Sequence, residues 1–392
     1  MTVHVIREPW KNREALRLRN GKIEVAVLAG GGHLAEISLA SGEYAGLNCL
    51  WTPYWPTADP DSQRAANLVA RYGSDPAARF LAGYTGHTLC LDLFGPPSPK
   101  EAALGIALHG EAAVQSWSLK PTSNGCVGHV ELPAAQLRVE RRLTLASDSA
   151  VLFVTERVEN LGSEPRELQW VQHLTVGPPF LEAGDSFISA SLDKGLTSPL
   201  GYEGHARLRH NASFAWPYAP EIDGKIADLR VPFEQLGTGF IAATRVSPDR
   251  ALGFIAALNF RLGLSLIYCF RRRDFPWITI WEENCARTTV PWNAVVQARG
   301  MEFGTTPLPV GRDALHAMPT LLDTPSTRNL APGQTADARY LAALVTVPIN
   351  WQSIIDVQVE RNTLHLVGQQ HGSSIKIRVH GLSEFFKGDT EM

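Results

Sequence analysis

Residues 136–162, QLRVERRLTLASDSAVLFVTERVENLG, decide the fold class of this chain. Apolar residues alternate with polar residues through the first half of the stretch, the second half begins with the apolar run AVLFV at 150–154, and Ser147-Asp148 supplies a turn between the halves. A period of two is typical of strands with one buried face, and two such strands joined by a short turn predict an antiparallel hairpin. We therefore expect an antiparallel meander over about residues 104–176.

The same alternation recurs along most of the chain, whereas a helical period is rare. Turn residues such as the glycines at 30–32 separate the alternating runs. Residues 62–71 are one of the few stretches that favour a short helix, and residues 181–232 resemble loops. The other predicted elements are a hairpin at 23–39, strands between 240 and 284, a hairpin at 357–366 and a last strand at 375–379.

Length and composition indicate an ordinary globular protein, long enough for two or three average domains or for one large all-β unit. The chain has 392 residues, of which 44% are hydrophobic and 19% charged. Without repeats or a convincing linker, residues 1–392 are expected to form one domain, with an N-terminal sheet region at about 1–180 and a C-terminal one at about 235–392. Strands with one polar face must stack as two or more sheets, and a concave sheet face offers a binding cleft.

Several classes of partner are not indicated. The net charge of −3, from 36 basic and 39 acidic residues, gives no footprint for nucleic acid or an anionic membrane. The N-terminus lacks the apolar run of a signal peptide, and no later run is long enough to span a bilayer. The five cysteines contain no CxxC pair, so neither disulfides nor zinc are expected. We expect a cytoplasmic protein and leave a homodimer open.

Common catalytic motifs are missing as well. The sequence contains no GxSxG elbow, no GxxxxGK[ST] phosphate loop and no HExxH helix. The glycines at 30–32 are not spaced for a dinucleotide. We therefore expect neither a metal nor a cofactor.

Four residues stand out as candidates for proton transfer, because each lies at the end of an apolar strand bounded by Gly or Pro. Glu302 lies in VVQARGMEFGTTPLP, His109 in GIALHGEAAVQSW, His173 in LQWVQHLTVGPPFL and His87 in GYTGHTLCL. A histidine can donate a proton to one oxygen while a carboxylate removes one from a hydroxyl. For each of them, a surface or hydrogen-bonding role is the alternative.

A second acidic candidate is the pair Glu282 and Glu283, in WITIWEEN. Two carboxylates can serve a glycoside hydrolase, so that reaction stays open at this point.

In the order of its motifs, the chain resembles the galactose mutarotase-like superfamily, which includes the aldose 1-epimerases. The resemblance runs over roughly residues 20–310. NGKIEVAVLAGGGHLAEISL is similar to the first hairpin of the family, and HGEAAVQSW to its His-Gly segment. ERVENLGSEPRELQWVQHLTV is similar to the strand pair before its second histidine, and VVQARGMEFGTTPLP to the strand that ends in its glutamate.

The resemblance implies a β-supersandwich of large, mainly antiparallel sheets with a sugar on its concave face. It implies a carbohydrate isomerase in which His173 protonates the ring oxygen, Glu302 takes the proton of the anomeric hydroxyl and His109 assists by hydrogen bonding. No cofactor is needed for this reaction. Trp292 adds an aromatic face, and the expected substrate contacts are His87, Glu111, Trp170, Trp281, Glu283 and Arg299.

The chain also departs from the family. GYTGHTLCL stands where aldose epimerases carry a Gly-Arg…Asn-Arg motif, so their arginine is missing and His87 is expected to replace it. For the family's substrate-binding aspartate, Asp223 and Asp228 are available without a matching context. A carbohydrate-binding protein without catalysis is therefore the second reading, and a glycoside hydrolase or lyase the third.

Overall fold

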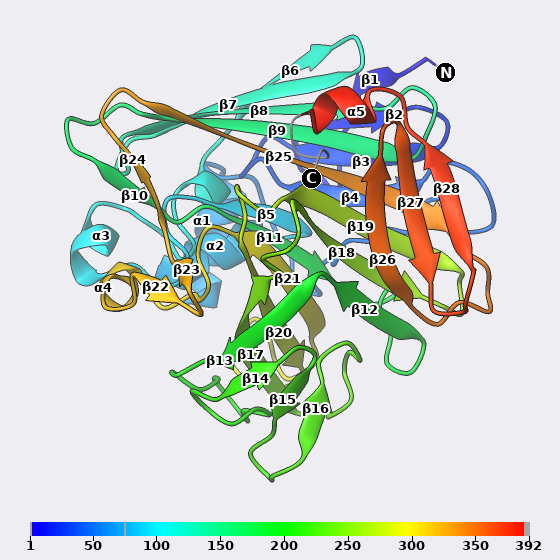
Figure 1. Ribbon diagram of the computed structural model, residues 1–392. Helices are drawn as coiled ribbons and strands as arrows, with labels where there is room; N and C mark the ends of the chain where they lie inside the picture. The colour runs from blue at the N-terminus through cyan, green and yellow to red at the C-terminus, as the bar shows by residue number, and fades with distance from the viewer. Residues whose placement is uncertain (1, 74–75, 388–392) are drawn as a thin grey trace.

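The computed structural model describes residues 2–73 and 76–387. Two large sheets dominate it, and all neighbouring strands described in them pair antiparallel (Figure 1). The all-β prediction is confirmed. In the described part of the chain, the larger sheet has eleven strands in the order β1 (His4–Arg7), β2 (Ala15–Arg19), β3 (Ile23–Leu28), β4 (Leu34–Leu39), β5 (His87–Cys90), β11 (Val171–Val176), β21 (Gln297–Gly304), β20 (Trp277–Asn284), β17 (Thr238–Val246), β13 (Leu192–Thr197) and β14 (Ser213–Ala215).

The second sheet stacks on the first. Among the described residues it has eight strands, in the order β12 (Ser186–Ala190), β18 (Leu252–Asn259), β19 (Leu264–Arg271), β25 (Thr335–Thr346), β9 (Val151–Asn160), β8 (Leu137–Leu145), β7 (Gly125–Leu132) and β6 (Ser118–Thr122). The hairpin expected in residues 136–162 is β8 and β9, and the one expected in 23–39 is β3 and β4. Both sheets take strands from both halves of the chain, so the expected N-terminal and C-terminal sheet regions are interleaved.

Smaller elements surround the two sheets. The C-terminal hairpin and last strand form a third layer of β26 (Ile354–Glu360), β27 (Thr363–Gly368) and β28 (Ser374–Arg378), which packs on the outer face of the second sheet through Trp351 (Figure 1). Residues 181–232, expected as loops, supply β12 to one sheet and β13 and β14 to the other. The remaining pairs are β10 (Arg166–Leu168) with β24 (Arg328–Leu330), β15 (Tyr218–Pro220) with β16 (Ile226–Asp228), and β22 (Thr320–Leu321) with β23 (Thr324–Pro325).

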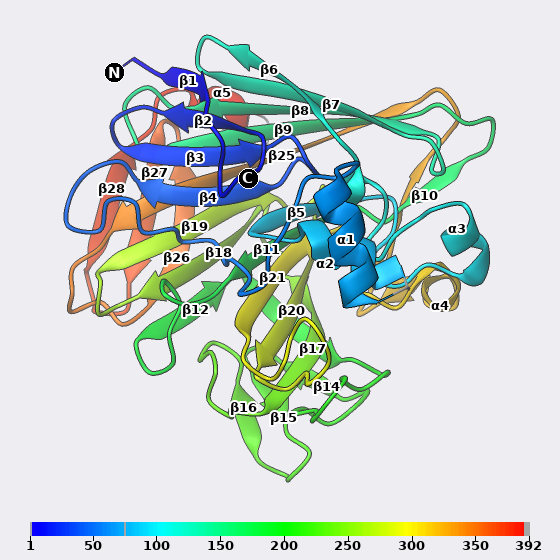
Figure 2. The same ribbon diagram turned by 180° about the vertical axis from the view of Figure 1, so that it is seen from behind.

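Helices are short. The helix expected at 62–71 is α1 (Gln63–Tyr72), and the Ser62 side chain caps it by accepting from the Ala65 N–H. Figure 2 shows α1 and α2 (Pro76–Gly83) beside β5 and β11. The other helices are α3 (Pro99–Ala103), η1 (Ala112–Val114), α4 (Arg312–His316) and α5 (Leu382–Phe385). None of the helices in the described residues is long and apolar enough to cross a membrane.

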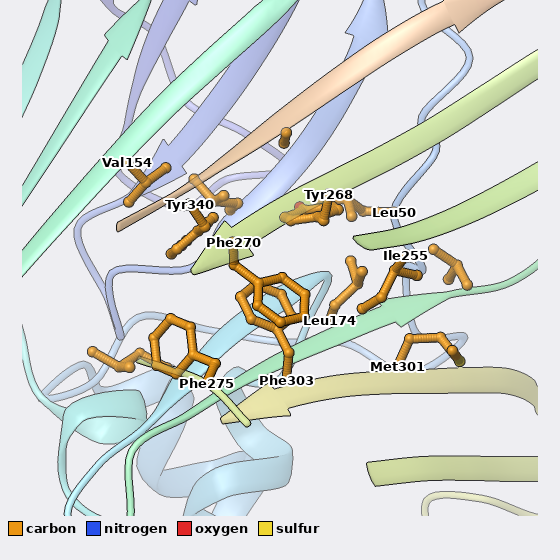
Figure 3. Close-up of a cluster of buried hydrophobic side chains, with 14 of the residues drawn as sticks. Leu50, Val154, Leu174, Ile255, Tyr268, Phe270, Phe275, Met301, Phe303 and Tyr340 are labelled. Carbon is orange, nitrogen blue, oxygen red and sulfur yellow. The ribbon is translucent and has the colours of Figure 1, made fainter. Parts of the chain in front are cut away.

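The main core lies between the two large sheets. Phe270 of β19 stacks on Phe303 of β21 with ring centroids 4.6 Å apart, and Tyr268 and Tyr340 lie beside them (Figure 3). Because side chains alternate along a strand, the residues between these core positions must face the opposite side of the larger sheet. A second apolar cluster, which includes Phe80 of α2, covers that outer face.

Candidate active site

A cavity of about 230 Å³ opens on the outer face of the larger sheet. Aromatic side chains from the sheet, from α2 and from the loop between β20 and β21 form much of its wall. The polar side chains of the cavity are few and of types that exchange protons or bind oxyanions. The residues that matter for its chemistry are Phe80, Tyr84, His109, His173, Glu203, Trp281, Arg287, Trp292 and Glu302.

His173 and Glu302 meet because β11 and β21 are neighbours. Their antiparallel register pairs Gln172 with Phe303 and Thr175 with Gly300, which sets His173 opposite Glu302. Nε2 of His173 lies 3.3 Å from Oε1 of Glu302. Gly300 leaves room for this contact, since a Cβ there would lie 2.3 Å from Oε1 of Glu302. The two residues are 129 positions apart in sequence and share one cavity floor.

Two hydroxyl groups hold the other side of the His173 ring. Nδ1 of His173 lies 3.1 Å from Oγ1 of Thr175 and 3.4 Å from the Tyr84 hydroxyl, and these two oxygens are 2.7 Å apart. Tyr84 and Thr175 are buried. Because a hydroxyl can donate or accept, this pair can serve Nδ1 in either protonation state of the ring. It therefore keeps Nε2 directed at Glu302.

His109 reaches the cavity from the loop that precedes η1. The Gly95 N–H donates to Nδ1 of His109 at 3.3 Å, and the ring centroids of His109 and His173 are 5.2 Å apart. A backbone N–H can only donate, so Nδ1 of a neutral His109 accepts and its hydrogen sits on Nε2. His109 can thus donate one hydrogen bond to a ligand oxygen without carrying a charge.

Burial controls the protonation of all three groups. It lowers the pKa of His173 to about 3 and holds the pKa of His109 well below its ordinary value. It raises the pKa of Glu302 well above its ordinary value, an effect that the positive charge of Arg287 opposes. A raised pKa makes Glu302 a stronger base than an ordinary carboxylate, and a lowered pKa makes protonated His173 a stronger acid.

Sequence reasoning missed Arg287 and the two aromatic residues from the α2 region, Phe80 and Tyr84. Arg287 lies in the loop after β20, only four positions beyond Glu283, which the sequence had singled out. Its guanidinium carbon lies 4.7 Å from the ring centroid of Trp292 and 5.7 Å from that of Trp281. A loop has no periodicity that indicates which side its residues face, so the sequence carries no signal for this placement.

Of the six predicted substrate contacts, only Trp281 lines the cavity. His87 pairs with Leu174 across β5 and β11, and paired residues face the same side of a sheet. His87 therefore faces the second sheet, opposite to His173, where its ring nitrogens lie 3.1 Å from the Tyr268 hydroxyl and 3.0 Å from Oε1 of Gln172. This placement corrects the expectation that His87 replaces the missing arginine.

The other predicted contacts have partners within the protein. Trp170 donates to Oε2 of Glu156 at 2.8 Å in the main core, and Arg299 pairs with Glu282 there. Glu111 accepts from the Ala134 and Ala135 N–H groups. We therefore do not propose Trp170, Arg299 or Glu111 as substrate contacts.

Glu283 supports the cavity wall from behind. Its carboxylate accepts from the N–H groups of Ala286 and Arg287 and from the Tyr202 hydroxyl. Asp223 and Asp228 lie away from the cavity, in the β15–β16 hairpin, where they pair with Lys225 and Arg230. Among the residues that the structure describes, no group of three or more His, Cys, Asp or Glu side chains is placed to hold a metal ion.

The fold and the site together define a large β-sandwich protein with a small acid–base cavity on one sheet. No protein-family model matches the sequence, and a search of curated proteins found no match. Solved structures do match. A galactose mutarotase-like protein from Clostridium acetobutylicum is 14% identical with a TM-score of 0.58, over 88% of this chain and 99% of that protein.

Two further structures agree with that match. A Klebsiella pneumoniae protein, described only provisionally as an aldose 1-epimerase, is 15% identical with a TM-score of 0.57, over 87% of this chain and 82% of that one. A galactose mutarotase related enzyme from Lactobacillus acidophilus is 12% identical with a TM-score of 0.51, over 85% and 98%. The chain has the galactose mutarotase-like fold, as its motif order predicted.

The low pKa of His173 predicts a measurable sensitivity of the fold to acid. The unfolded chain takes up this proton below about pH 6.5 while the native protein does not, so the contribution of His173 to stability is complete above that pH and is lost as the pH falls towards 3. Wild type should lose about 2 kcal/mol through this group between pH 6.5 and 4.5, and His173→Gln should not. Urea unfolding at both pH values measures the difference, with exposed His371→Gln as control; equal losses in wild type and His173→Gln would contradict it.

Proposed function

We propose that this protein is an isomerase that interconverts the anomers of a monosaccharide. The reaction starts when the proton that Glu302 holds moves across the contact of 3.3 Å to Nε2 of His173. His173 then donates this proton to the ring oxygen while Glu302 takes the proton of the anomeric hydroxyl, which breaks the bond between C1 and the ring oxygen and opens the ring. The C1–C2 bond then rotates, and the two proton transfers run in reverse, so that the ring closes as the other anomer. His109 donates a hydrogen bond to the substrate.

One observation carries the proposal, the contact of 3.3 Å between Nε2 of His173 and Oε1 of Glu302 inside the cavity. The ring oxygen and the anomeric hydroxyl are bonded to the same carbon, so an acid and a base must lie close together to reach both. Each proton transfer of this kind contributes about 10² to 10⁴ in rate. The mutarotase and aldose 1-epimerase names of the structural neighbours are compatible with this chemistry.

A glycoside hydrolase has less support. Glu282 and Glu283 are adjacent on β20 and so face opposite sides of the sheet. Glu282 pairs with Arg299 in the core and Glu283 is bound by the loop after β20, which leaves neither carboxylate for a sugar. Release of reducing ends from an oligosaccharide would favour this reaction over ours.

Anomer exchange tests the proposal directly. Freshly dissolved α-anomers of a panel of aldoses and acidic sugars are followed by polarimetry, and exchange at equilibrium by NMR, with and without the protein. We expect acceleration with at least one sugar. Measurable binding without acceleration of any bound sugar would instead favour a non-catalytic carbohydrate-binding protein.

A further inference from the structure

Arg287 is held in the cavity wall by its loop and by aromatic rings. Oε1 of Glu283 accepts from the Ala286 N–H at 2.6 Å and from the Arg287 N–H at 3.0 Å, which fixes the backbone at this point. The guanidinium carbon lies 4.8 Å from the ring centroid of Tyr202 and 4.7 Å from that of Trp292. The charge is thus placed beside the cavity before any ligand arrives.

The hydrogen-bonding capacity of this guanidinium is not used within the described part of the protein. None of the described residues accepts a hydrogen bond from it, and its Nε is buried without a hydrogen-bond partner. The nearest carboxylate oxygens lie 3.5 Å from Nε, on Glu203, and 3.7 Å from it, on Glu283. A guanidinium has five N–H donors in one plane. Leaving these donors without hydrogen bonds in a partly buried site costs free energy.

The two nearby carboxylates do not cancel this cation. The oxygens of Glu283 already accept from two backbone N–H groups and the Tyr202 hydroxyl. Glu203 has a side chain that is 58% exposed, so water screens its charge. The field of Arg287 does reach the cavity, where it opposes the rise in the pKa of Glu302.

The fork of N–H donors on an arginine matches a carboxylate with two parallel hydrogen bonds. The cavity of about 230 Å³ is smaller than the roughly 300 to 1,000 Å³ of sites for drug-sized ligands, so it suits a single sugar ring without a bulky substituent. We infer that Arg287 binds the carboxylate of an acidic monosaccharide, a uronate. This inference rests on the proposed function, because it takes the ligand of the cavity to be a sugar.

Calorimetric titration of the full chain tests the inference without reference to catalysis. The probes are D-glucuronate, D-galacturonate, the neutral sugars D-glucose and D-galactose, and glucose 6-phosphate. We expect at least one uronate to bind about 30-fold more tightly than its neutral counterpart. Arg287→Gln should remove that preference, Arg287→Lys should keep part of it, and Arg209→Gln should change nothing because Arg209 is exposed outside the cavity.

Removing a negative charge at the edge of the cavity provides an independent test, because uronate affinity should then rise. Glu203→Gln removes the negative charge 3.5 Å from Nε of Arg287, so it should tighten uronate binding. The gain should be only about two- to fivefold, because the pair is solvent-exposed on the side of Glu203. The ratio of uronate affinity to D-glucose affinity should rise, and a fall in this ratio would contradict the placement of the carboxylate.

Three results would overturn the inference. The first is equal affinity of wild type for uronates and neutral sugars, and the second is an unchanged uronate preference in folded Arg287→Gln. The third is tighter binding of glucose 6-phosphate than of either uronate, which would assign the guanidinium to a phosphate ester. If any of these results is found while the protein still accelerates anomer exchange on a neutral sugar, the proposed function stands and this inference fails; no binding and no exchange with any sugar would remove both.

Discussion

Glu302→Gln is expected to slow anomer exchange by about 10² to 10⁴ while the protein stays folded. Glutamine keeps the size of the side chain but cannot take the proton of the anomeric hydroxyl. The polarimetric assay on the sugar with the largest wild-type acceleration measures the loss. Glu131→Gln, on the exposed surface of β7, is the matched control and should keep the wild-type rate. A Glu302→Gln variant with the wild-type rate would remove this residue from the mechanism.

Stability separates a lost proton transfer from a damaged fold. Burial raises the pKa of Glu302, so its contribution to stability is present below the pKa of the unfolded chain and is lost as the pH rises through the native pKa. At neutral pH the wild type therefore carries a free-energy cost that Glu302→Gln does not, and the variant should be at least as stable.

His173 and Glu302 act on one substrate as a unit. Adding His173→Gln to Glu302→Gln should therefore slow anomer exchange little further than Glu302→Gln alone.

The sequence predicted the positions of strands well, but it predicted poorly which strands lie next to each other in the sheets. Period-2 alternation identified β8 and β9, because buried and more exposed residues alternate along β8 and along the second half of β9. It could not show that β5, β11 and β21 lie side by side, since these strands are far apart in the chain and their pairing depends on the packing of the whole sheet. A short sequence motif contains no information about such long-range register.

The same physical cause explains the mixed outcome at the site. Every residue of β5 and β11 is buried, so alternation does not indicate which face of these strands looks into the cavity. His173 and His87 were both predicted as site residues from their places at strand ends, His173 as an acid and His87 as a substrate contact, and the register puts them on opposite faces of the sheet. Glu302 lies beside His173 because their strands are neighbours and Gly300 leaves space for the contact, whereas Arg287 lies in a loop that no sequence pattern indicates.

We expect the largest effect on stability from a change in the buried network around the ion pair of Arg141 and Glu156, which includes Trp170. Glu156 pairs with Arg141 at 2.7 Å and accepts from Trp170 and Gln172, and both charged side chains are at most 1% exposed. Glu156→Leu leaves the Arg141 charge buried without its partner, which typically costs about 3 to 5 kcal/mol. We expect the free energy of unfolding in urea to fall by that amount at neutral pH.

Two further variants show whether the uncompensated charge is the cause. Glu159→Leu lies on the same strand and removes a half-buried carboxylate that pairs with exposed Arg138, so it should cost less than about 1 kcal/mol. Adding Arg141→Met to Glu156→Leu removes the orphaned charge, and most of the lost stability should return because replacing a whole buried ion pair by apolar groups is often neutral. If Glu156→Leu costs no more than Glu159→Leu, or the double variant stays as unstable as the single one, the uncompensated charge of Arg141 is not the cause of the lost stability.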